Sequence, residues 1–391
     1  MPPRTSARVA STTAIKRASS SSSSSNSAAA PPPKRTKSAP AAPEPSKKPA
    51  KKTKGRNDTA TEMIEEEEPA EMATVEAKKS RKKAVPDSDS PAAPKAGDTL
   101  ADPTLPKNTE MPRELEFARP AAAGAVRIAA WNITSLKSSE PKGLMRYIAA
   151  EDADVLVLSE TKVNDVPIHP GLTAMYKYQY WGIGKTKGYA GLAVLSKLEP
   201  LKVTYGLPGL ADQDTKGRIV TLEFEHTHVI GTYAVNAGEG LKTMETKQKW
   251  NEAFAKYVAQ LDGGEKGVIW CGDLNVVLDE RDLAAASKKW NKSPGYTAQE
   301  CDAHHALLAG AAVDGALPLV DVWRHQHPHL VGHYTFYGWR GFCRSKGIGW
   351  RLDSFIVSKR IVQKALDCQI RHECYGASDH VPIYCDFAGP L

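Results

Sequence analysis

Three apolar runs of this chain each end in a polar residue that could bind a metal ion or a phosphate group. Asn132 follows the run 126–131, Glu160 closely follows 154–158, and Asp273 closely follows 267–271. Short runs of this composition predict buried central strands. An acid at the end of a buried strand is costly to ionise unless a positive charge lies beside it. A bound cation near Glu160 and Asp273 would account for both acids.

Two further segments supply candidate ligands, Gly272-Asp273-Leu274-Asn275 and Ser378-Asp379-His380. Asp273 and Asn275 are two residues apart, so in an extended segment their side chains face the same way. Hard oxygen donors without a sulfur cluster favour Mg²⁺ over Zn²⁺. Taken singly, each segment could be a turn, a cap or a salt-bridging pair. Their combination at separate strand ends favours a functional site, because structure alone seldom needs so many acids there.

The elements around these segments alternate apolar runs with helical stretches. Helical spacing covers 144–151 and 244–261, and Trp250, Phe254 and Tyr257 form one stripe that we expect to be core. Turn residues separate further strands predicted at 178–182, 190–195, 201–205, 218–224, 228–235, 333–337, 350–357, 366–371 and 381–387. Many strands with a few helices predict an α/β fold of two packed sheets with helices outside, a four-layer αββα sandwich.

The composition divides the chain into a tail, residues 1–124, and a folded domain, residues 125–391. All eight Trp and all six Cys lie in the domain, whereas the tail contains a serine run, Ala/Pro blocks and charge clusters. Such a tail buries too little apolar area to offset the entropy of ordering, so we expect it to be disordered.

The positive charge of the chain also belongs to the tail, which has 22 Lys and Arg against 16 Asp and Glu, compared with 30 against 29 in the domain. Its basic clusters at 34–37, 47–52 and 78–83 suit import into the nucleus or attraction to phosphates. A solvated linker is the plainer alternative, and the acid-free, Arg- and Ser-rich start leaves a mitochondrial presequence open.

Membrane proteins and disulfide-rich proteins do not fit this sequence. No apolar stretch approaches the ~20 residues that cross a bilayer, and the start of the chain lacks the hydrophobic core of a secretory signal. The cysteines show no CxxC spacing, which argues against zinc and against a disulfide framework. We expect a soluble intracellular monomer with reduced thiols.

Six segments of the domain resemble, in order, the signature series of one family. They are 131–132, 160–162, 233–238, 272–275, 349–353 and 378–383. On these motifs the chain resembles the exonuclease III family of AP endonucleases, within the DNase I-like endonuclease/exonuclease/phosphatase superfamily. Glu160 and Asp379-His380 alone would indicate only the superfamily, whereas Gly-Trp-Arg-Leu-Asp and Tyr-x-x-Asn-Ala-Gly point to the AP-endonuclease branch.

The resemblance implies hydrolysis by water at phosphorus, with Mg²⁺, or Mn²⁺ as a substitute, neutralising phosphate oxygens. His380, oriented by Asp353, resembles the group that polarises the scissile phosphate. Asp273 resembles the residue that activates water or, in a competing scheme, protonates the leaving group. The implied catalytic residues are Tyr233, Asp273, Asn275, Asp353 and His380. The implied metal ligands are Asn132, Glu160, Asp273, Asn275, Asp379 and His380.

The resemblance also implies a DNA-binding surface. Phe336 and Trp350, with Leu352, match an apolar pocket that receives a flipped-out abasic deoxyribose and excludes a nucleotide with a normal base. Core packing is the alternative for these aromatics, and a solvated surface charge for Arg344. The implied DNA-binding residues are Lys162, Tyr189, Asn236, Phe336, Arg344 and Trp350.

Three positions depart from the family pattern. Thr134 replaces an Asp or Asn of many relatives, so we expect a weakened contact near the metal. Glu239 replaces an Arg that enters DNA in some animal relatives, although Arg340 could substitute for it. Ser293 lies in a loop one residue longer than in those relatives, where an Asn would contact phosphate.

The function that follows is incision of double-stranded DNA 5′ to an abasic site during base excision repair. Action on blocked 3′ ends, as a 3′-phosphodiesterase or 3′-to-5′ exonuclease, is expected beside it. Two alternatives stay open: a phosphatase of the same superfamily acting on another phosphoester, such as an inositol phosphate or sphingomyelin, and a catalytically weakened DNA-binding scaffold.

Overall fold

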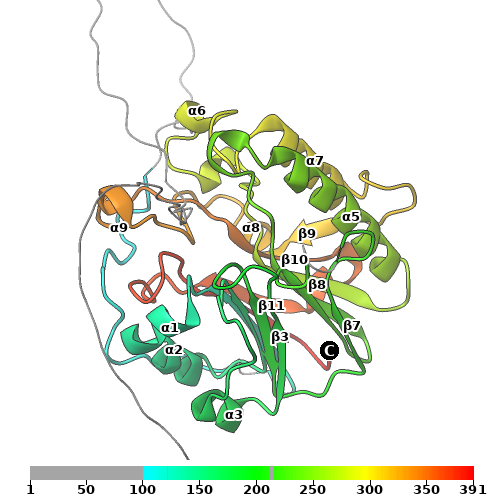
Figure 1. The fold of residues 1–391 in the computed structure, drawn as a ribbon, viewed down its shortest axis with the longest axis horizontal. Coiled ribbons are helices and arrows are strands. Elements are labelled where there is room, and N and C mark those ends of the chain that lie inside the picture. The colour runs from blue at the N-terminus through cyan, green and yellow to red at the C-terminus, as the bar shows by residue number, and fades with distance from the viewer. Residues whose placement is uncertain (1–99, 121, 212–214) are drawn as a thin grey trace, which may run out of the picture. The chain divides into compact units, whose positions relative to one another are not determined.

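A computed structural model describes residues 100–391, except 121 and 212–214. Within these residues, two six-stranded sheets pack face to face and helices cover their outer faces (Figure 1). The predicted four-layer αββα sandwich is therefore confirmed. The expected disorder of residues 1–99 lies outside the described residues.

The strands are β1 (Val126–Asn132), β2 (Val155–Ser159), β3 (Tyr178–Gly182), β4 (Leu192–Ser196), β5 (Lys202–Tyr205), β6 (Ile219–Glu223), β7 (Thr227–Tyr233), β8 (Gly267–Asp273), β9 (Leu319–Asp321), β10 (Asp353–Ser358), β11 (Ala365–Ile370) and β12 (Ile383–Phe387). The α-helices are α1 (Leu136–Ser139), α2 (Leu144–Glu151), α3 (Pro170–Met175), α5 (Met244–Asp262), α6 (Ala286–Lys289), α7 (Ala298–Ala309), α8 (Val322–Gln326) and α9 (Cys343–Lys346). Short 3₁₀ turns include η3 (Glu239–Leu241) and η5 (Arg340–Phe342).

Each sheet has a parallel pair of strands at its centre. The first sheet runs β11-β12-β1-β2-β4-β3, and β1 lies parallel to β2 with Asn132 opposite Ser159. The second runs β5-β6-β7-β8-β10-β9, and β7 lies parallel to β8 with Tyr233 opposite Asp273. Parallel neighbours bring their carboxyl ends to the same edge of a sheet, so both pairs end together.

The core has three main layers, which explains why the central strands are buried on both faces. Side chains of alternate residues in β1 point to different layers: Ile128 and Ala130 face the second sheet, and Ala129 and Trp131 face α2 and α3. A third layer joins the second sheet to α5 and α7. The aromatic stripe of α5 lies in this layer, as predicted, with Trp250, Phe254 and Tyr257 buried.

One prediction of secondary structure is wrong near the later strands. Residues 333–337 form no strand but make isolated bridges, from Phe336 to Trp350 and to His380. Thr335 Oγ1 accepts hydrogen bonds from the backbone N–H groups of Leu352 (3.0 Å) and Asp353 (3.1 Å), so a side chain takes the place of part of a ladder. The strand β9 and the α-helices other than α2 and α5 were not predicted.

The predicted boundary at residue 124 is also wrong, because residues 100–120 pack on the domain. Ala101 N–H donates to Gly347 O at 2.7 Å, and Met111 is buried in the layer beneath α2. The ring centres of Phe117 and Tyr147 lie 6.3 Å apart. The guanidinium of Arg371 lies 3.8 Å from the centre of the Phe117 ring. A few well-placed apolar contacts thus hold a segment whose composition predicts a tail.

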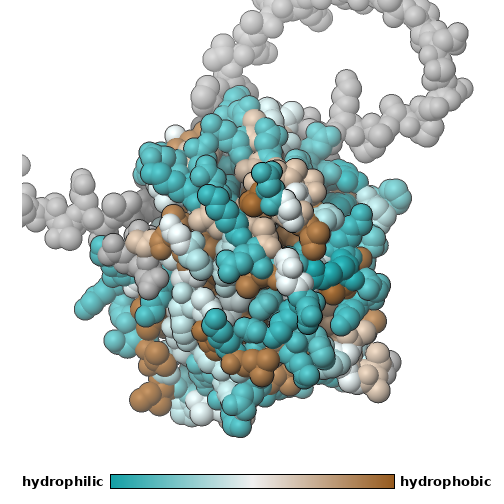
Figure 2. Space-filling model, turned by 90° about the vertical axis from the view of Figure 1, so that its right-hand side faces the viewer, coloured by the Kyte–Doolittle hydropathy of each residue, from teal (hydrophilic) through white to brown (hydrophobic). Residues whose placement is uncertain are grey.

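The surface of the domain is mostly polar. On the face shown in Figure 2, hydrophilic residues dominate and hydrophobic residues are scattered between them. Among the described residues, none of the helices combines the length and the apolar composition that crossing a membrane requires.

Candidate active site

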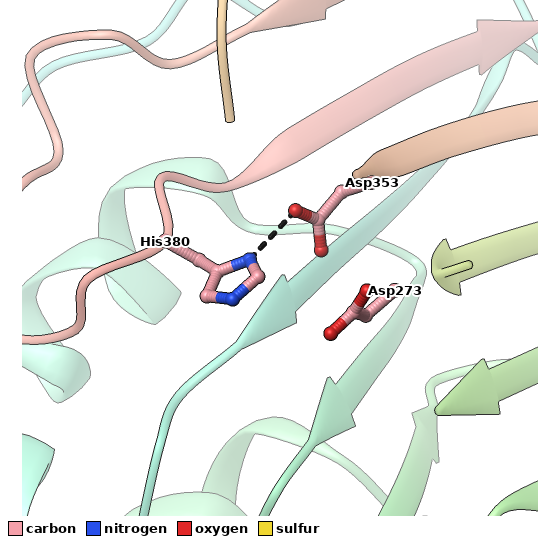
Figure 3. Close-up of side chains that lie close together, drawn as sticks. All are labelled: Asp273, Asp353 and His380. Carbon is pink, nitrogen blue, oxygen red and sulfur yellow. Dashed lines mark hydrogen bonds and ion pairs between the residues drawn. The ribbon is translucent and has the colours of Figure 1, made fainter. Parts of the chain in front are cut away.

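The polar residues predicted at the strand ends meet at one end of the sandwich. Asp273 ends β8 and lies opposite Asp353, the first residue of β10. His380 precedes β12, which runs antiparallel to β1 and so brings it to the end of that strand. Figure 3 shows the side chains of these three residues turned toward a common space. Their ligand atoms lie within 4.8 Å of one another, and all three residues are buried.

His380 and Asp353 form a close, buried ion pair in the site. His380 Nδ1 and Asp353 Oδ2 are 2.8 Å apart, which leaves Nε2 as the outward-facing ring nitrogen (Figure 3). Burial by itself lowers the pKa of His380, but the carboxylate of Asp353 outweighs it, and the pKa rises to about 10. The imidazole is therefore a cation at neutral pH.

Asp273 has the opposite shift. Burial and the nearby charge of Asp353 raise the pKa of Asp273 to about 7, although His380 and hydrogen bonds from Asn132 and Asn275 oppose the rise. Asn132 Nδ2 donates to Asp273 Oδ2 at 3.0 Å, and the backbone N–H of Asn275 donates to Asp273 Oδ1 at 2.9 Å. A carboxyl group that titrates near neutral pH suits general acid–base chemistry.

Hydrogen bonds join Asn275 to the end of β7. Asn275 Nδ2 donates to Ala234 O at 3.0 Å, and Asn275 Oδ1 accepts from Asn236 Nδ2 at 2.9 Å. Tyr233 lies opposite Asp273 in the sheet, and the guanidinium of Arg218 lies 4.7 Å from its ring centre. The structure thus brings Tyr233 and Asn236 to the predicted site, and it adds Arg218, which the motifs did not identify.

A second group of acids lies beside the first. Asn132 Nδ2 donates to Glu160 Oε1 at 2.8 Å, and Thr134 Oγ1 donates to Asp379 Oδ1 at 2.9 Å. Burial raises the pKa of Asp379, and the neighbouring charge of Glu160 adds to the rise. The Thr134 hydroxyl thus contacts Asp379 directly, and the weakened metal contact expected at this position stays a prediction.

These residues fit a divalent cation. Glu160 and Asp379 repel each other while both offer carboxylate oxygens, so a cation between them would offset the repulsion. Hard cations prefer such oxygens. A protonated His380 has no free lone pair on either ring nitrogen, so the oxygen donors of Glu160, Asp379 and Asn132 are the better ligand set.

Several residues in and beside the site have left-handed backbone conformations, Glu160 and Asn275 among them. Glu160 has a φ of 53° and Asn275 a φ of 48°, both in the left-handed region. Such a conformation costs roughly 1 kcal/mol or more for a residue other than glycine. It turns both side chains away from the direction that a continuing strand would give them.

The predicted DNA-binding residues divide into two groups. Phe336 and Trp350 are half-buried against a small cluster that includes Leu283 and Leu352, and the Phe336 ring lies 4.9 Å from the His380 ring. Lys162 lies at the rim, with Nζ 3.0 Å from Glu160 Oε2. Tyr189 is 46% exposed and accepts a hydrogen bond from Arg218 Nη2 at 3.0 Å.

Arg344 does not belong to this surface, and its prediction as a DNA contact is wrong. The side chain is 3% exposed, its guanidinium lies 4.6 Å from the ring centre of Tyr337 and 5.0 Å from that of Tyr375, and it donates to His372 O. It anchors the loop before β12 from within.

Lys247 is a second residue that sequence reasoning missed. Its Nζ lies directly behind the Asp273–Asn275 segment, and burial lowers its pKa to about 8. In the sequence, Lys247 stands only three residues before Trp250 of the aromatic stripe, and a lysine at such a place is expected to be exposed to solvent.

Known proteins resemble this chain in sequence and in fold. Residues 129–380 match the Endonuclease/Exonuclease/phosphatase family. The chain is 36% identical over 259 residues to an exodeoxyribonuclease of Bacillus subtilis (strain 168). This match covers 66% of the chain and 98% of the relative. It is 37% identical over 261 residues to a DNA-(apurinic or apyrimidinic site) endonuclease of Dictyostelium discoideum. That match covers 66% of the chain and 69% of the relative.

Among solved structures, a 3′ phosphatase from Neisseria bound to a product DNA hairpin is similar, with a TM-score of 0.59 and 25% identity. The likeness covers 67% of this chain and 99% of that one. The chain belongs to the Endonuclease/Exonuclease/phosphatase family, and the resemblance to its AP endonucleases and exodeoxyribonucleases that the motifs indicated is confirmed.

Proposed function

We propose that this protein is a Mg²⁺-dependent DNA-(apurinic or apyrimidinic site) endonuclease of base excision repair. It hydrolyses the phosphodiester 5′ to an abasic site and also removes blocking groups at 3′ ends. The observation that carries the proposal is the buried group of Asp273, Asp353 and His380 next to the half-buried rings of Phe336 and Trp350.

The His380 cation binds the scissile phosphate through its Nε2–H group. Asp353 holds the ring by the 2.8 Å contact at Nδ1 and keeps it charged, as the raised pKa of His380 indicates. A fixed cation at this place stabilises the extra negative charge that develops on the phosphate oxygens in the transition state.

Asp273 takes the proton of the attacking water. Its pKa of about 7 lets it lose a proton before the reaction and gain one during it. Asn275 holds the water against phosphorus, since its amide is fixed by the hydrogen bonds to Ala234 O and from Asn236. The phenol of Tyr233, on the strand beside Asp273, donates to a phosphate oxygen.

Glu160 and Asp379, with Asn132, would hold the Mg²⁺ ion. When bound, the ion supplies charge neutralisation at a phosphate oxygen and at the leaving 3′-oxygen. Asn132 orients Glu160 and Thr134 orients Asp379 through the hydrogen bonds described above. Mn²⁺, which also binds carboxylates, is the expected substitute.

The pocket of Phe336, Trp350 and Leu352 receives the abasic deoxyribose. Its apolar wall fits a sugar without a base, and a missing base lowers the cost of turning the nucleotide out of the helix. Lys162 and Tyr189 at the rim contact the DNA backbone, and we expect the enzyme to act as a monomer in the nucleus. The scaffold alternative depended in part on Thr134, and the hydrogen bond of Thr134 to Asp379 supports the enzyme reading instead.

The test is incision of a duplex oligonucleotide with one tetrahydrofuran abasic analogue. We expect cleavage 5′ to the analogue by the wild type, dependent on Mg²⁺ and abolished by EDTA. Asp273→Asn should lose about 10²-fold or more in rate, and Glu160→Ala should need more Mg²⁺. Glu245→Ala, at an acid whose side chain is 80% exposed on α5, is the control and should cleave normally. Tight DNA binding without cleavage by the wild type at any Mg²⁺ concentration would overturn the proposal in favour of a scaffold.

A further inference from the structure

One buried amine lies behind the proposed water-binding segment. Lys247 belongs to the first turn of α5 and is 2% exposed. Its Nζ donates to Leu274 O at 3.1 Å and to Asn275 O at 3.2 Å. Burial of a lysine is costly unless polar partners surround it, so this contact needs a structural or functional reason.

The contact completes the hydrogen bonding of a segment that has no regular ladder. Leu274 N–H donates to Leu352 O at 2.9 Å, and Asn275 N–H donates to Asp273 Oδ1 at 2.9 Å, so both N–H groups are bonded on the side of β10 and Asp273. The two carbonyls point the other way, toward α5. Buried carbonyls need donors, and Lys247 serves both with a single group.

This arrangement bears on the direction of the Asn275 side chain. Asn275 has a φ of 48°, a left-handed conformation that Asn adopts more readily than most residues and that ends the strand here. Its side-chain amide bonds Ala234 and Asn236, while its main-chain carbonyl bonds Lys247. A change in the carbonyl direction would rotate the peptide and move the amide from its partners.

A carboxylate of α7 supplies charge near the amine. Glu300 is 1% exposed and accepts hydrogen bonds from Gly295 N–H, at 3.0 and 2.9 Å, and from Thr297 Oγ1 at 2.8 Å. Gly295 O in turn accepts from Val277 N–H at 2.8 Å. Lys247 and Glu300 line the same cavity, and the charge of Glu300 favours the protonated form of Lys247.

We propose that Lys247 is a positioning residue, which fixes the Leu274–Asn275 backbone so that the Asn275 amide meets the attacking water. Glu300 compensates the charge of Lys247 inside the protein. This inference rests on the function proposed above. Lys247 touches no reacting atom, so its effect passes through Asn275.

The experiment compares Lys247→Met, Lys247→Arg and the control Lys249→Met under single-turnover conditions with the tetrahydrofuran duplex. Lys249 lies on the same helix with its side chain 63% exposed, so its loss removes only a surface ion pair. We expect Lys247→Met to lower the rate of the chemical step by about 10- to 100-fold, with DNA affinity changed less than about twofold. Lys247→Arg, which keeps donors for both carbonyls, should recover most of the rate.

A double-mutant cycle with Asn275→Ala separates positioning from general damage. In the Asn275→Ala background, Lys247→Met should cost less than about threefold, because its route of action is already gone. Equal losses in both backgrounds, or an unchanged rate in Lys247→Met, would overturn the inference while wild-type cleavage continues to support the proposed function. A wild type that does not cleave would overturn both. Thermal unfolding of each variant sets an assay temperature at which all are folded.

Discussion

The pair of His380 and Asp353 predicts how the incision rate depends on pH, and Asp353→Asn should change that dependence in a defined direction. The pKa of His380 is about 10 and that of Asp273 about 7. The working form, with His380 protonated and Asp273 ionised, is therefore most abundant between these values. The wild-type rate should rise through pH 7 and fall near pH 10.

The magnitude follows from the contact of 2.8 Å between His380 Nδ1 and Asp353 Oδ2. A rise in the pKa of His380 from 6.5 to about 10 corresponds to an interaction on the order of 5 kcal/mol in favour of the charged ring. In Asp353→Asn, the burial that lowers the pKa of His380 remains, but the carboxylate charge that raises this pKa most is lost. The pKa of His380 should fall toward 6.5 or below, and that of Asp273 should also fall, because the charge of Asp353 raises it.

The assay is single-turnover incision of the tetrahydrofuran duplex between pH 5.5 and 10.5 at saturating Mg²⁺. For Asp353→Asn we expect both limbs of the profile to move to lower pH and the rate at pH 8 to fall by about 10² to 10⁴-fold. Glu245→Gln, at a side chain that is 80% exposed, should keep the wild-type profile. A high-pH limb that stays in place in Asp353→Asn would refute the assignment of His380 as the charged group.

Three further predictions test the pocket and the interior. Trp350→Ala should lower kcat/KM for the abasic duplex by at least about tenfold while digestion of a normal 3′ end changes less, and equal losses on both substrates would contradict the pocket. Arg344→Met should reduce the free energy of unfolding in urea by about 2 to 4 kcal/mol. It should leave the salt dependence of DNA binding unchanged, and a shallower dependence in the variant would show that Arg344 contacts phosphate after all. Burial lowers the pKa of His304 to about 3 against 6.5 when unfolded, so below pH 6.5 only the unfolded chain gains its proton and stability falls as pH decreases toward 3. His304→Phe should therefore recover about 2 kcal/mol of the stability that the wild type loses between pH 7.5 and 5, measured by urea unfolding at both values.

Strand ends and spacing predicted the candidate metal-binding residues, whereas Tyr233 and Asp353 were identified only by the family resemblance. The run that ends at Asn132 and the run that ends before Glu160 form parallel neighbours, so their ends had to meet. The Gly272–Asn275 segment shows a limit of this reasoning. Its even spacing suggested two side chains on one face, but Asn275 has left the extended conformation, and its amide reaches Asp273 Oδ2 only at 3.4 Å.

What could not be predicted depends on long-range contacts of residues with ordinary surface character. Arg344 lies in a Gly- and Lys-containing stretch that reads as an exposed loop, yet Asn108, 236 residues earlier in the chain, accepts a hydrogen bond from it at 3.3 Å. Asn108 belongs to the segment 100–120, whose composition is poor in apolar residues and therefore predicts a tail. Met111 and Phe117 nevertheless find partners in a layer that β1 and α2 have already formed.

Lys247 shows why such contacts matter for function as well as for the fold. Its neighbours on α5, Lys249 and Lys256, are exposed, and no local pattern distinguishes the one lysine that is buried. The difference arises because the turn after β8 directs two carbonyls toward the first turn of α5, where only a long donor reaches both. Motifs can identify the residues that touch a substrate from their types, whereas residues that hold those groups in place become visible only when their partners are known.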